Sequence, residues 1–178
     1  IGRGFEMMRE LGLIDKYPRL VCAQAKQADP FYISYKSGFK KFEAIQAKKT
    51  LASAIQIGDP VSVKKAIKTL QVFDGIVEEA TESELANAVG RANLTGLFCC
   101  PHTGVALAVL EKLVNQGEIS KSDRVIVVST ANGLKFTDFL HKYHTDKLEG
   151  ISSEFAYAPI DLPADYEKVK ETILNSVV

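Results

Sequence analysis

The sequence predicts an α/β fold in which a parallel sheet carries helices on both faces. Strand-like and helix-like segments alternate along the chain, an order that favours right-handed β-α-β units. Residues 124–130, RVIVVST, form a largely β-branched run, which is typical of a central parallel strand covered on both faces. With 46% hydrophobic residues in a chain of 178, one sizeable core is expected.

The first part of the chain predicts a helix, a strand and a loop. Apolar residues at helical spacing indicate the first helix: Phe5, Met8 and Leu11. Gly12 follows as a stop signal. The short apolar run RLVCAQA at 19–25 predicts a buried strand. Residues 29–50 have no clean period, so we expect a loop that contains a short helix.

Two helix starts can be read in the middle of the chain. Asp59 and Pro60 resemble an N-cap residue followed by proline at the first helical position. The helix that they predict runs until the strand-like segment 75–80, GIVEEA, begins near Gly75. Thr81 and Glu84 then form the pattern of a capping box, which predicts the start of the next helix.

The last part of the chain predicts further strands and helices. Residues 97–100, LFCC, are expected to form a short strand closed by Pro101, and 103–116 a helix that is apolar nearly all round. That helix should therefore be buried. Residues 141–162 are polar and irregular, whereas 163–178 have helical spacing and are expected to pack on the outside.

Charge and cysteine content exclude several classes of partner. The 22 basic and 22 acidic residues balance, which gives no electrostatic reason to expect nucleic acid or an anionic membrane. No apolar run approaches the roughly 20 residues of a membrane span. Three cysteines, two of them adjacent, cannot build a disulfide framework, so a reducing compartment is expected. No metal site is expected either, because Cys99 and Cys100 on a strand would point to opposite faces, away from a shared ion with His102.

Three short segments are rich in small residues and hydroxyl groups: TLASAIQIGDP at 50–60, CPHTGVAL at 100–107 and VVSTANGLKF at 127–136. Each lies at or near a predicted strand end or helix start. Small residues let a flat ligand approach the backbone, and ligands of parallel sheets bind beyond the carboxyl ends of the strands. Ordinary turn and capping chemistry explains any one of these segments equally well.

Together the segments carry a family resemblance. With GFEMMRELGLID at 4–15 and GIVEEATESEL at 75–85, they resemble the plant-type threonine synthases, a branch of the fold type II (β-family) pyridoxal-phosphate enzymes. The resemblance extends to the last residues of the chain. It implies that 1–140 are the C-terminal part of the large cofactor-binding α/β domain, and that 141–178 are a C-terminal extension with a terminal helix.

The resemblance also implies a reaction. Its cofactor is pyridoxal 5'-phosphate, and its substrate is O-phosphohomoserine, which with water yields threonine and phosphate. In this family the Schiff-base lysine and the loop that binds the cofactor phosphate lie upstream of the first helix, so we expect no catalytic residue within 1–178. A helix already under way at Ile1 agrees with a chain truncated at its start. The intact protein is expected to be a homodimer, located in the chloroplast stroma in a plant and otherwise in the cytoplasm.

Two cofactor contacts carry over from the family by position. Thr130 matches the residue whose hydroxyl bonds the pyridine nitrogen. A neutral hydroxyl does not enforce a protonated ring as a carboxylate does, which favours elimination and replacement chemistry. Ala54 matches the small residue that covers one face of the ring, and Ser53 lies beside it on the same turn.

The remaining site residues line the surrounding loops. Gly58 and Asp59 belong to the turn that contains Ala54. The family resemblance places three residues in the helix-start loop facing the cofactor: Pro101, His102 and Thr103. Amide dipoles at such a helix start favour nearby negative charge. Asn132 is also expected at the cofactor, where the family usually has histidine, but an amide cannot carry a proton in acid-base catalysis.

Two alternatives remain open at this stage. The spellings PHTGVAL and SAIQIGDP argue against other fold type II enzymes, such as threonine dehydratase or cysteine synthase. A non-catalytic homologue that binds pyridoxal phosphate but has lost its lysine differs from the enzyme only outside this chain. The sequence upstream of this chain distinguishes the enzyme from the non-catalytic homologue, because only the enzyme has the lysine there.

Overall fold

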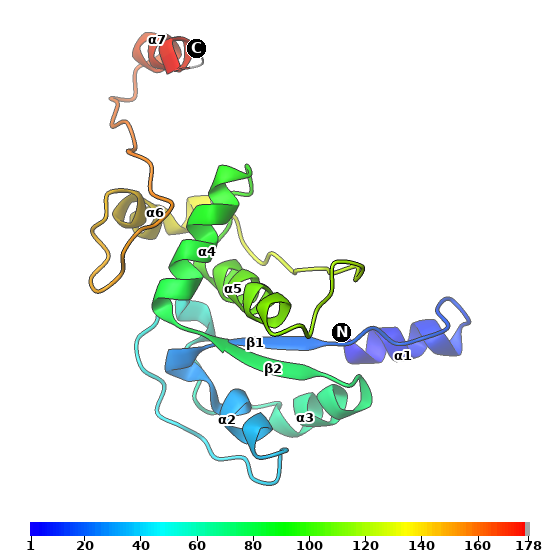
Figure 1. The fold of residues 1–178 in the computed structure, drawn as a ribbon. Coiled ribbons are helices and arrows are strands. Elements are labelled where there is room, and N and C mark those ends of the chain that lie inside the picture. The colour runs from blue at the N-terminus through cyan, green and yellow to red at the C-terminus, as the bar shows by residue number, and fades with distance from the viewer. Residues whose placement is uncertain (177–178) are drawn as a thin grey trace.

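Two parallel strands form the centre of the fold (Figure 1). The computed structural model describes residues 1–176. Strand β1 (Val21–Ala25) pairs in register with β2 (Ile76–Ala80). Both were predicted, β1 from a short apolar run and β2 from the strand-like segment 75–80, and β2 is buried at four of its five positions. Strand β2 therefore lies inside the protein, whereas β1 is buried only at Ala25.

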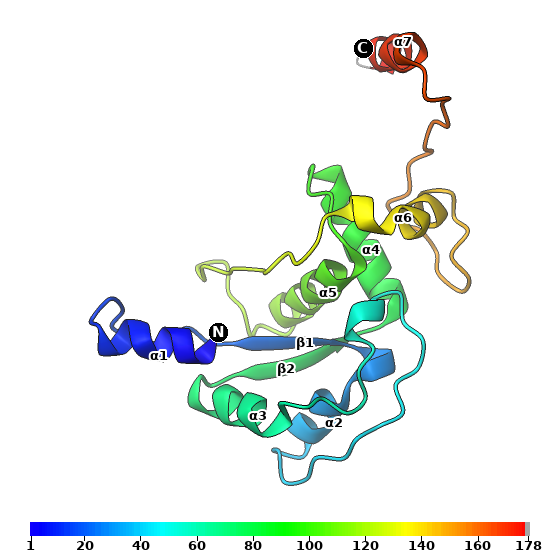
Figure 2. The ribbon, with the colours of Figure 1, turned by 180° about the vertical axis from the view of Figure 1, so that it is seen from behind.

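Helices cover the two faces of this sheet. Helix α5 (Pro101–Asn115) packs on one face and α2 (Pro30–Lys36) on the other. The rear view shows the same layers, with α4 (Glu82–Leu94) beyond α5 (Figure 2). The predicted α/β class, a parallel sheet with helices on both faces, is confirmed.

The main core lies between α4, α5 and the sheet. Its side chains are almost completely buried: Leu85, Val89, Val105, Val109 and Leu113. Burying one such side chain typically stabilises a protein by about 1.5–3 kcal/mol. The predicted burial of the helix at 103–116 is thus confirmed. This helix, α5, begins two residues earlier than expected, with Pro101 as its first residue rather than the end of a strand.

Several predicted boundaries are confirmed by local geometry. Helix α1 (Gly2–Glu10) ends just before Gly12, which has φ +69°. The chain from 29 to 50 is largely loop and contains α2, as expected. At the start of α4, the Thr81 hydroxyl and the Glu84 side chain satisfy each other's main-chain amides, so the capping box is present.

The helix predicted from Asp59 begins later than expected. Helix α3 runs over Val63–Val72 with Ser62 as its N-cap, so both the predicted start and the predicted end near Gly75 are wrong by about three residues. The reason is tertiary: the Gly58 carbonyl accepts the Ile45 amide at 3.0 Å. The backbone beside Asp59 is held against another loop and cannot enter the helix there.

Two predicted strands are not formed. Residues 97–100 contribute only an isolated antiparallel bridge between Cys99 and Asn132. The run 124–130 has no ladder partner within residues 1–176, and Ile126 is 90% exposed. A strand needs a neighbouring strand to pair with its amides and carbonyls. Strands β1 and β2 pair with each other, and neither pairs with 97–100 or 124–130.

The C-terminal region differs from expectation in two places. Residues from 141 were predicted to be irregular, but α6 (Thr137–His144) buries Phe139, Leu140 and Tyr143 against α4. The domain boundary predicted at 140/141 falls inside this helix. Helix α7 (Tyr166–Ser176) forms as predicted, but it has no buried residue and projects from the body (Figure 1). Its predicted outer packing is therefore wrong; the preceding stretch, which contains Pro159 and Pro163, leads it away.

No helix within residues 1–176 has both the length and the apolar character that a membrane span requires.

Candidate functional site

Three segments that are distant in sequence meet at the start of α5. The His102 Nε2 atom accepts the Ala54 amide at 2.9 Å, which joins α5 to the short 3-10 helix η2 (Ser53–Ile55). The His102 ring also packs edge-on against Phe136, with centroids 5.2 Å apart. Phe136 closes a second 3-10 helix, η3 (Gly133–Phe136). The three segments singled out in the sequence therefore form one cluster.

A chain of hydroxyl and thiol groups runs through this cluster. The Ser129 Oγ lies 3.2 Å from Thr103 Oγ1, which lies 3.3 Å from Cys100 Sγ. Cys100 Sγ then contacts Thr130 Oγ1 at 3.8 Å. Thr103 and Cys100 are buried, whereas Ser129 and Thr130 are exposed. The Thr130 hydroxyl thus contacts a buried thiol although the residue itself is exposed.

The two adjacent cysteines have different environments. Burial raises the pKa of the Cys99 thiol to about 11. Burial also raises the pKa of Cys100, but the hydroxyl and amide of Thr103 and the hydroxyl of Thr130 outweigh it, so that this pKa lies below its ordinary value. Both thiols are free. Sequence reasoning treated both as structural and missed the contact of Cys100 with Thr130; its place just before the helix-starting Pro101 was the available signal.

The loop 51–55 is held at two main-chain amides. Leu51 donates to the Glu82 carboxylate at 2.7 Å, and Ala54 donates to His102. The alanines in this loop face opposite ways: Ala52 is completely buried, whereas Ala54 is exposed, as is Ser53. The side chain that the sequence assigns to a ligand is therefore on the open side of the loop.

Two of the predicted site residues have other contacts, and a third is exposed. Gly58 lies against the backbone of Ile45, where a Cβ would come within 1.9 Å of the carbonyl oxygen. Asp59 is exposed on the following turn. The Asn132 side chain accepts the Leu134 amide at 2.9 Å and so caps η3. The roles of these three residues toward a ligand stay predictions. The close backbone contact explains the glycine at 58, and the cap of η3 explains the asparagine at 132.

His102 is suited to the neutral form. Burial lowers the pKa of its imidazole below the usual value. Because Nε2 accepts the Ala54 amide, the proton of the neutral ring is on Nδ1.

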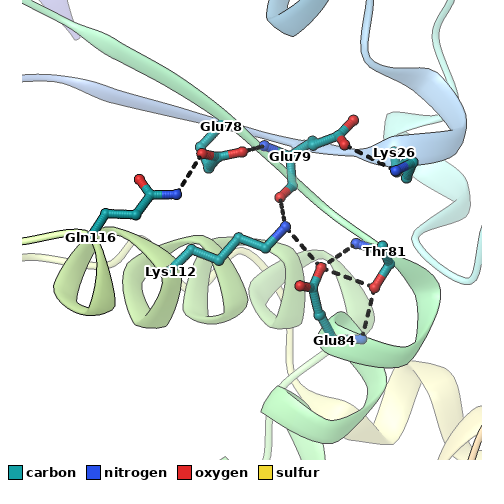
Figure 3. Close-up of polar contacts among 7 residues, drawn as sticks. All are labelled: Lys26, Glu78, Glu79, Thr81, Glu84, Lys112 and Gln116. Carbon is teal, nitrogen blue, oxygen red and sulfur yellow. Dashed lines mark hydrogen bonds and ion pairs between the residues drawn. The ribbon is translucent and has the colours of Figure 1, made fainter.

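A polar network fixes α5 against the end of β2 (Figure 3). Lys112 of α5 donates to the Glu79 carbonyl at 2.7 Å and forms an ion pair with Glu84 at 3.0 Å. Glu84 is the carboxylate of the α4 capping box, and these contacts place its pKa below the usual value despite partial burial. One lysine therefore joins strand, α4 and α5, the elements that position the start of α5.

Two carboxyl groups lie close together near the carboxyl ends of the strands. Asp29 and Glu79 are both buried, and Lys26 pairs with Glu79 at 3.3 Å. Burial, and then the neighbouring Glu79, raise the pKa of Asp29 to about 6. A raised carboxyl pKa in the folded state favours folding at low pH, and this contribution is lost as pH rises through about 6.

We therefore expect Asp29→Asn to stabilise the protein at neutral pH. Asparagine removes the repulsion from Glu79, and Asp29 makes no side-chain cap hydrogen bond that the change would lose. The gain in melting temperature should be largest above pH 7 and should vanish near pH 4, because wild-type Asp29 is then protonated. Thermal melts from pH 4 to 8 measure it, with Asp15→Asn at an exposed carboxyl as the control. Equal gains at all pH values would contradict the prediction.

The cluster contains no metal site of the usual kind. Within residues 1–176 no group of three histidine, cysteine, aspartate or glutamate side chains is placed to hold an ion. The arrangement instead offers an anchored hydroxyl, a small apolar platform at Ala54 and a helix start. These groups can bind a flat, polar ligand and contact both its edge and its face.

Comparison with known proteins gives a consistent set of matches. Residues 1–131 match the sequence model of a family described as "Pyridoxal-phosphate dependent enzyme". The chain is 51% identical to threonine synthase 2, chloroplastic, of Arabidopsis thaliana over 172 residues, which are 96% of this chain and 33% of that protein.

More distant relatives have the same name. The threonine synthase of Methanocaldococcus jannaschii is 31% identical over 139 residues, 78% of this chain and 34% of that protein. That of Mycobacterium tuberculosis H37Rv is 31% identical over 137 residues, 76% of this chain and 36% of the relative. The chain thus spans about a third of the length of the relatives it matches.

Proposed function

Because the chain belongs to the pyridoxal-phosphate-dependent enzyme family, we propose that it is the C-terminal part of a threonine synthase, which converts O-phosphohomoserine and water into threonine and phosphate. The observation that carries the proposal is its likeness to the Arabidopsis threonine synthase over almost its whole length. The archaeal and mycobacterial relatives support the same activity.

The residues of the cluster fit the cofactor of this family. Thr130 is an exposed residue, and its hydroxyl contacts the Cys100 thiol at 3.8 Å. Ala54 offers an exposed side chain small enough for a ring to lie against it. Both residues are exposed, so a ligand can reach them. A flat heterocycle can bond Thr130 through its nitrogen and lie with one face against Ala54.

The chain's own groups would bind and orient the cofactor. When bound, pyridoxal phosphate withdraws electrons from the substrate's carbon atoms and so permits loss of phosphate and addition of water. Thr130 would meet the ring nitrogen with a neutral hydroxyl, which moderates that withdrawal because it does not hold a full proton on the ring. Ala54 would fix the ring plane, and the start of α5 would present amides to negative charge.

The remaining assignments follow the same resemblance. We place the lysine that binds the cofactor, and the loop for its phosphate, outside residues 1–178. Residues 1–140 would complete the large domain, and 141–178 would form the C-terminal extension. The full-length protein would be a homodimer. It would be located in the chloroplast stroma in a plant, which the chloroplastic Arabidopsis relative supports, and otherwise in the cytoplasm.

The full-length protein tests the proposal directly. It is expected to release phosphate from O-phosphohomoserine in step with threonine formation, and to act far more slowly on threonine or O-acetylserine, the substrates of the alternative enzymes. Cofactor binding without any turnover would favour the non-catalytic homologue.

Borohydride reduction locates the missing lysine. Reducing the full-length holoenzyme and mapping its peptides should place the modified lysine outside residues 1–178. A stoichiometric adduct on a lysine within residues 1–178 would contradict the proposal that the cofactor-binding lysine lies outside them.

The Thr130→Val variant of the full-length protein tests the ring contact. Valine keeps the volume but leaves the ring nitrogen without a partner, which costs roughly 1–3 kcal/mol. Cofactor affinity should therefore fall about tenfold or more, as measured by fluorescence titration. Ser129→Ala, which removes the neighbouring hydroxyl, is the control and should weaken binding less. Equal affinity of Thr130→Val and wild type would show that the hydroxyl points elsewhere.

A further inference from the structure

His102 lies where three elements of the cluster meet. Its ring belongs to the first turn of α5, accepts a hydrogen bond from η2 and packs on Phe136 at the end of η3. The hydrogen bond is made to the Ala54 amide at 2.9 Å, which is the main-chain group of the residue proposed to cover the ring. A change at His102 therefore acts on the loop that carries Ala54.

We propose that His102 is a positioning residue: by accepting the Ala54 amide through Nε2, it fixes the loop 51–55 so that Ala54 meets the face of the bound ring. This inference rests on the proposed function for the identity of the ring. The contact between His102 and the loop does not depend on it.

The loop has a second anchor that differs in chemistry. Glu82, the first residue of α4, accepts the Leu51 amide at 2.7 Å. Between the two anchors, Ala52 is buried in the core and donates to Thr50 at 3.2 Å. Glu82 thus holds the side of the loop next to the core, and His102 holds the side next to the open face. Loss of His102 should free Ala54 while leaving Leu51 in place.

The hydrogen bond requires a neutral imidazole. A protonated histidine has two N–H donors and no acceptor, so it cannot receive the Ala54 amide. The surrounding elements contribute few charges. The short helix η2 has no ionisable side chain, η3 has the exposed Lys135, α4 has Glu82 on Leu51, and the Cys100 thiol immediately precedes α5. Burial is the cause that lowers the pKa of His102.

The sign of the pH effect follows from that direction. With its pKa below the usual value of 6.5, His102 is neutral at physiological pH and the loop is held. As pH falls through the lowered pKa, the imidazole gains a proton, the hydrogen bond to Ala54 is lost and the loop is released. Cofactor affinity should therefore decline on the acid side of pH 6.5 and stay constant above it.

Amide hydrogen exchange tests the contact without any cofactor. In the full-length apo protein, the Ala54 amide should lose roughly tenfold in protection factor in His102→Phe, which keeps a ring against Phe136 but has no acceptor. Leu51 should be unaffected. Glu82→Ala should give the reverse pattern. Unchanged protection of Ala54 in His102→Phe would overturn the proposal, whatever the protein catalyses.

Cofactor titration from pH 5 to 8 tests the functional consequence. The His102→Phe protein should bind pyridoxal phosphate about tenfold more weakly at pH 8 and should lack the acid-side decline of the wild type. In His102→Gln the side-chain carbonyl can take the place of Nε2 and does not titrate, so affinity should recover at pH 8 and remain flat down to pH 5. A merely structural histidine would not give this rescue with loss of pH dependence.

The outcomes separate the two proposals. If wild-type protein binds no pyridoxal phosphate, the proposed function fails, and the exchange experiment still decides the role of His102. If wild type binds the cofactor and turns over substrate while His102→Phe and His102→Gln keep its affinity and pH profile, the positioning role fails and the function stands.

Discussion

Replacing Ala54 with leucine in the full-length protein is expected to abolish the stabilisation that pyridoxal phosphate gives. The Ala54 side chain is exposed on the open side of its loop, so the larger residue meets no core side chain in the apo protein. It would instead occupy the space proposed for the ring, and overpacking of a fitted site costs about 1–3 kcal/mol before any exclusion of the ligand. Affinity should fall by about a hundredfold or more.

Melting curves with and without cofactor measure this effect. Ala52→Leu is the matched control, because Ala52 lies two residues away and is completely buried. That variant should lower the melting temperature of apo and holo protein alike, whereas Ala54→Leu should change only the holo protein. An Ala54→Leu protein that still gains normal stability from pyridoxal phosphate would rule out the platform.

The second large effect is expected at Gly104, where α5 lies close against α4. A Cβ at Gly104 would lie 2.5 Å from the Leu85 carbonyl oxygen and 2.6 Å from a methyl group of Val89. The carbonyl belongs to a helix backbone and cannot move aside as a flexible side chain would. Gly104→Ala should therefore push the two helices apart and destabilise the protein by about 1–3 kcal/mol.

Chemical denaturation of full-length Gly104→Ala measures this loss. Gly4 in α1 is the control, because a Cβ there meets no atom within 4 Å. Gly4→Ala should be neutral or stabilising by about 0.5–1 kcal/mol, since alanine is the better helix former. A Gly104→Ala protein as stable as wild type would show that α4 and α5 can separate without cost.

Local sequence signals located α1, α5, α7 and the capped start of α4, but they missed α6. The Thr81–Glu84 capping box and the positive φ at Gly12 are each decided by residues within a few positions, so spacing alone was sufficient. The start of α3 was misplaced because Gly58 is held by Ile45, a contact across the loop that no local pattern reports.

Strands were harder to predict, because a strand is completed by its neighbour. The segments 19–25 and 75–80 pair with each other, and both were predicted. The run 124–130 has the composition of a central strand, yet it has no partner within residues 1–176 and is largely exposed. Composition indicates that a segment is able to form a strand, and only the presence of a second strand decides that it does.

By itself, the sequence determined the α/β class, the family resemblance and the three segments that meet at the start of α5. Tertiary structure alone decided how those segments meet: that His102 accepts the Ala54 amide, that Cys100 contacts Thr130, and that Ala52 rather than Ala54 faces the core. The physical reason is the separation in sequence between the residues that interact. Turns, caps and periodicity are set by neighbours in the chain, whereas a hydrogen bond between residues 54 and 102 depends on how α5 packs against the sheet and the loop.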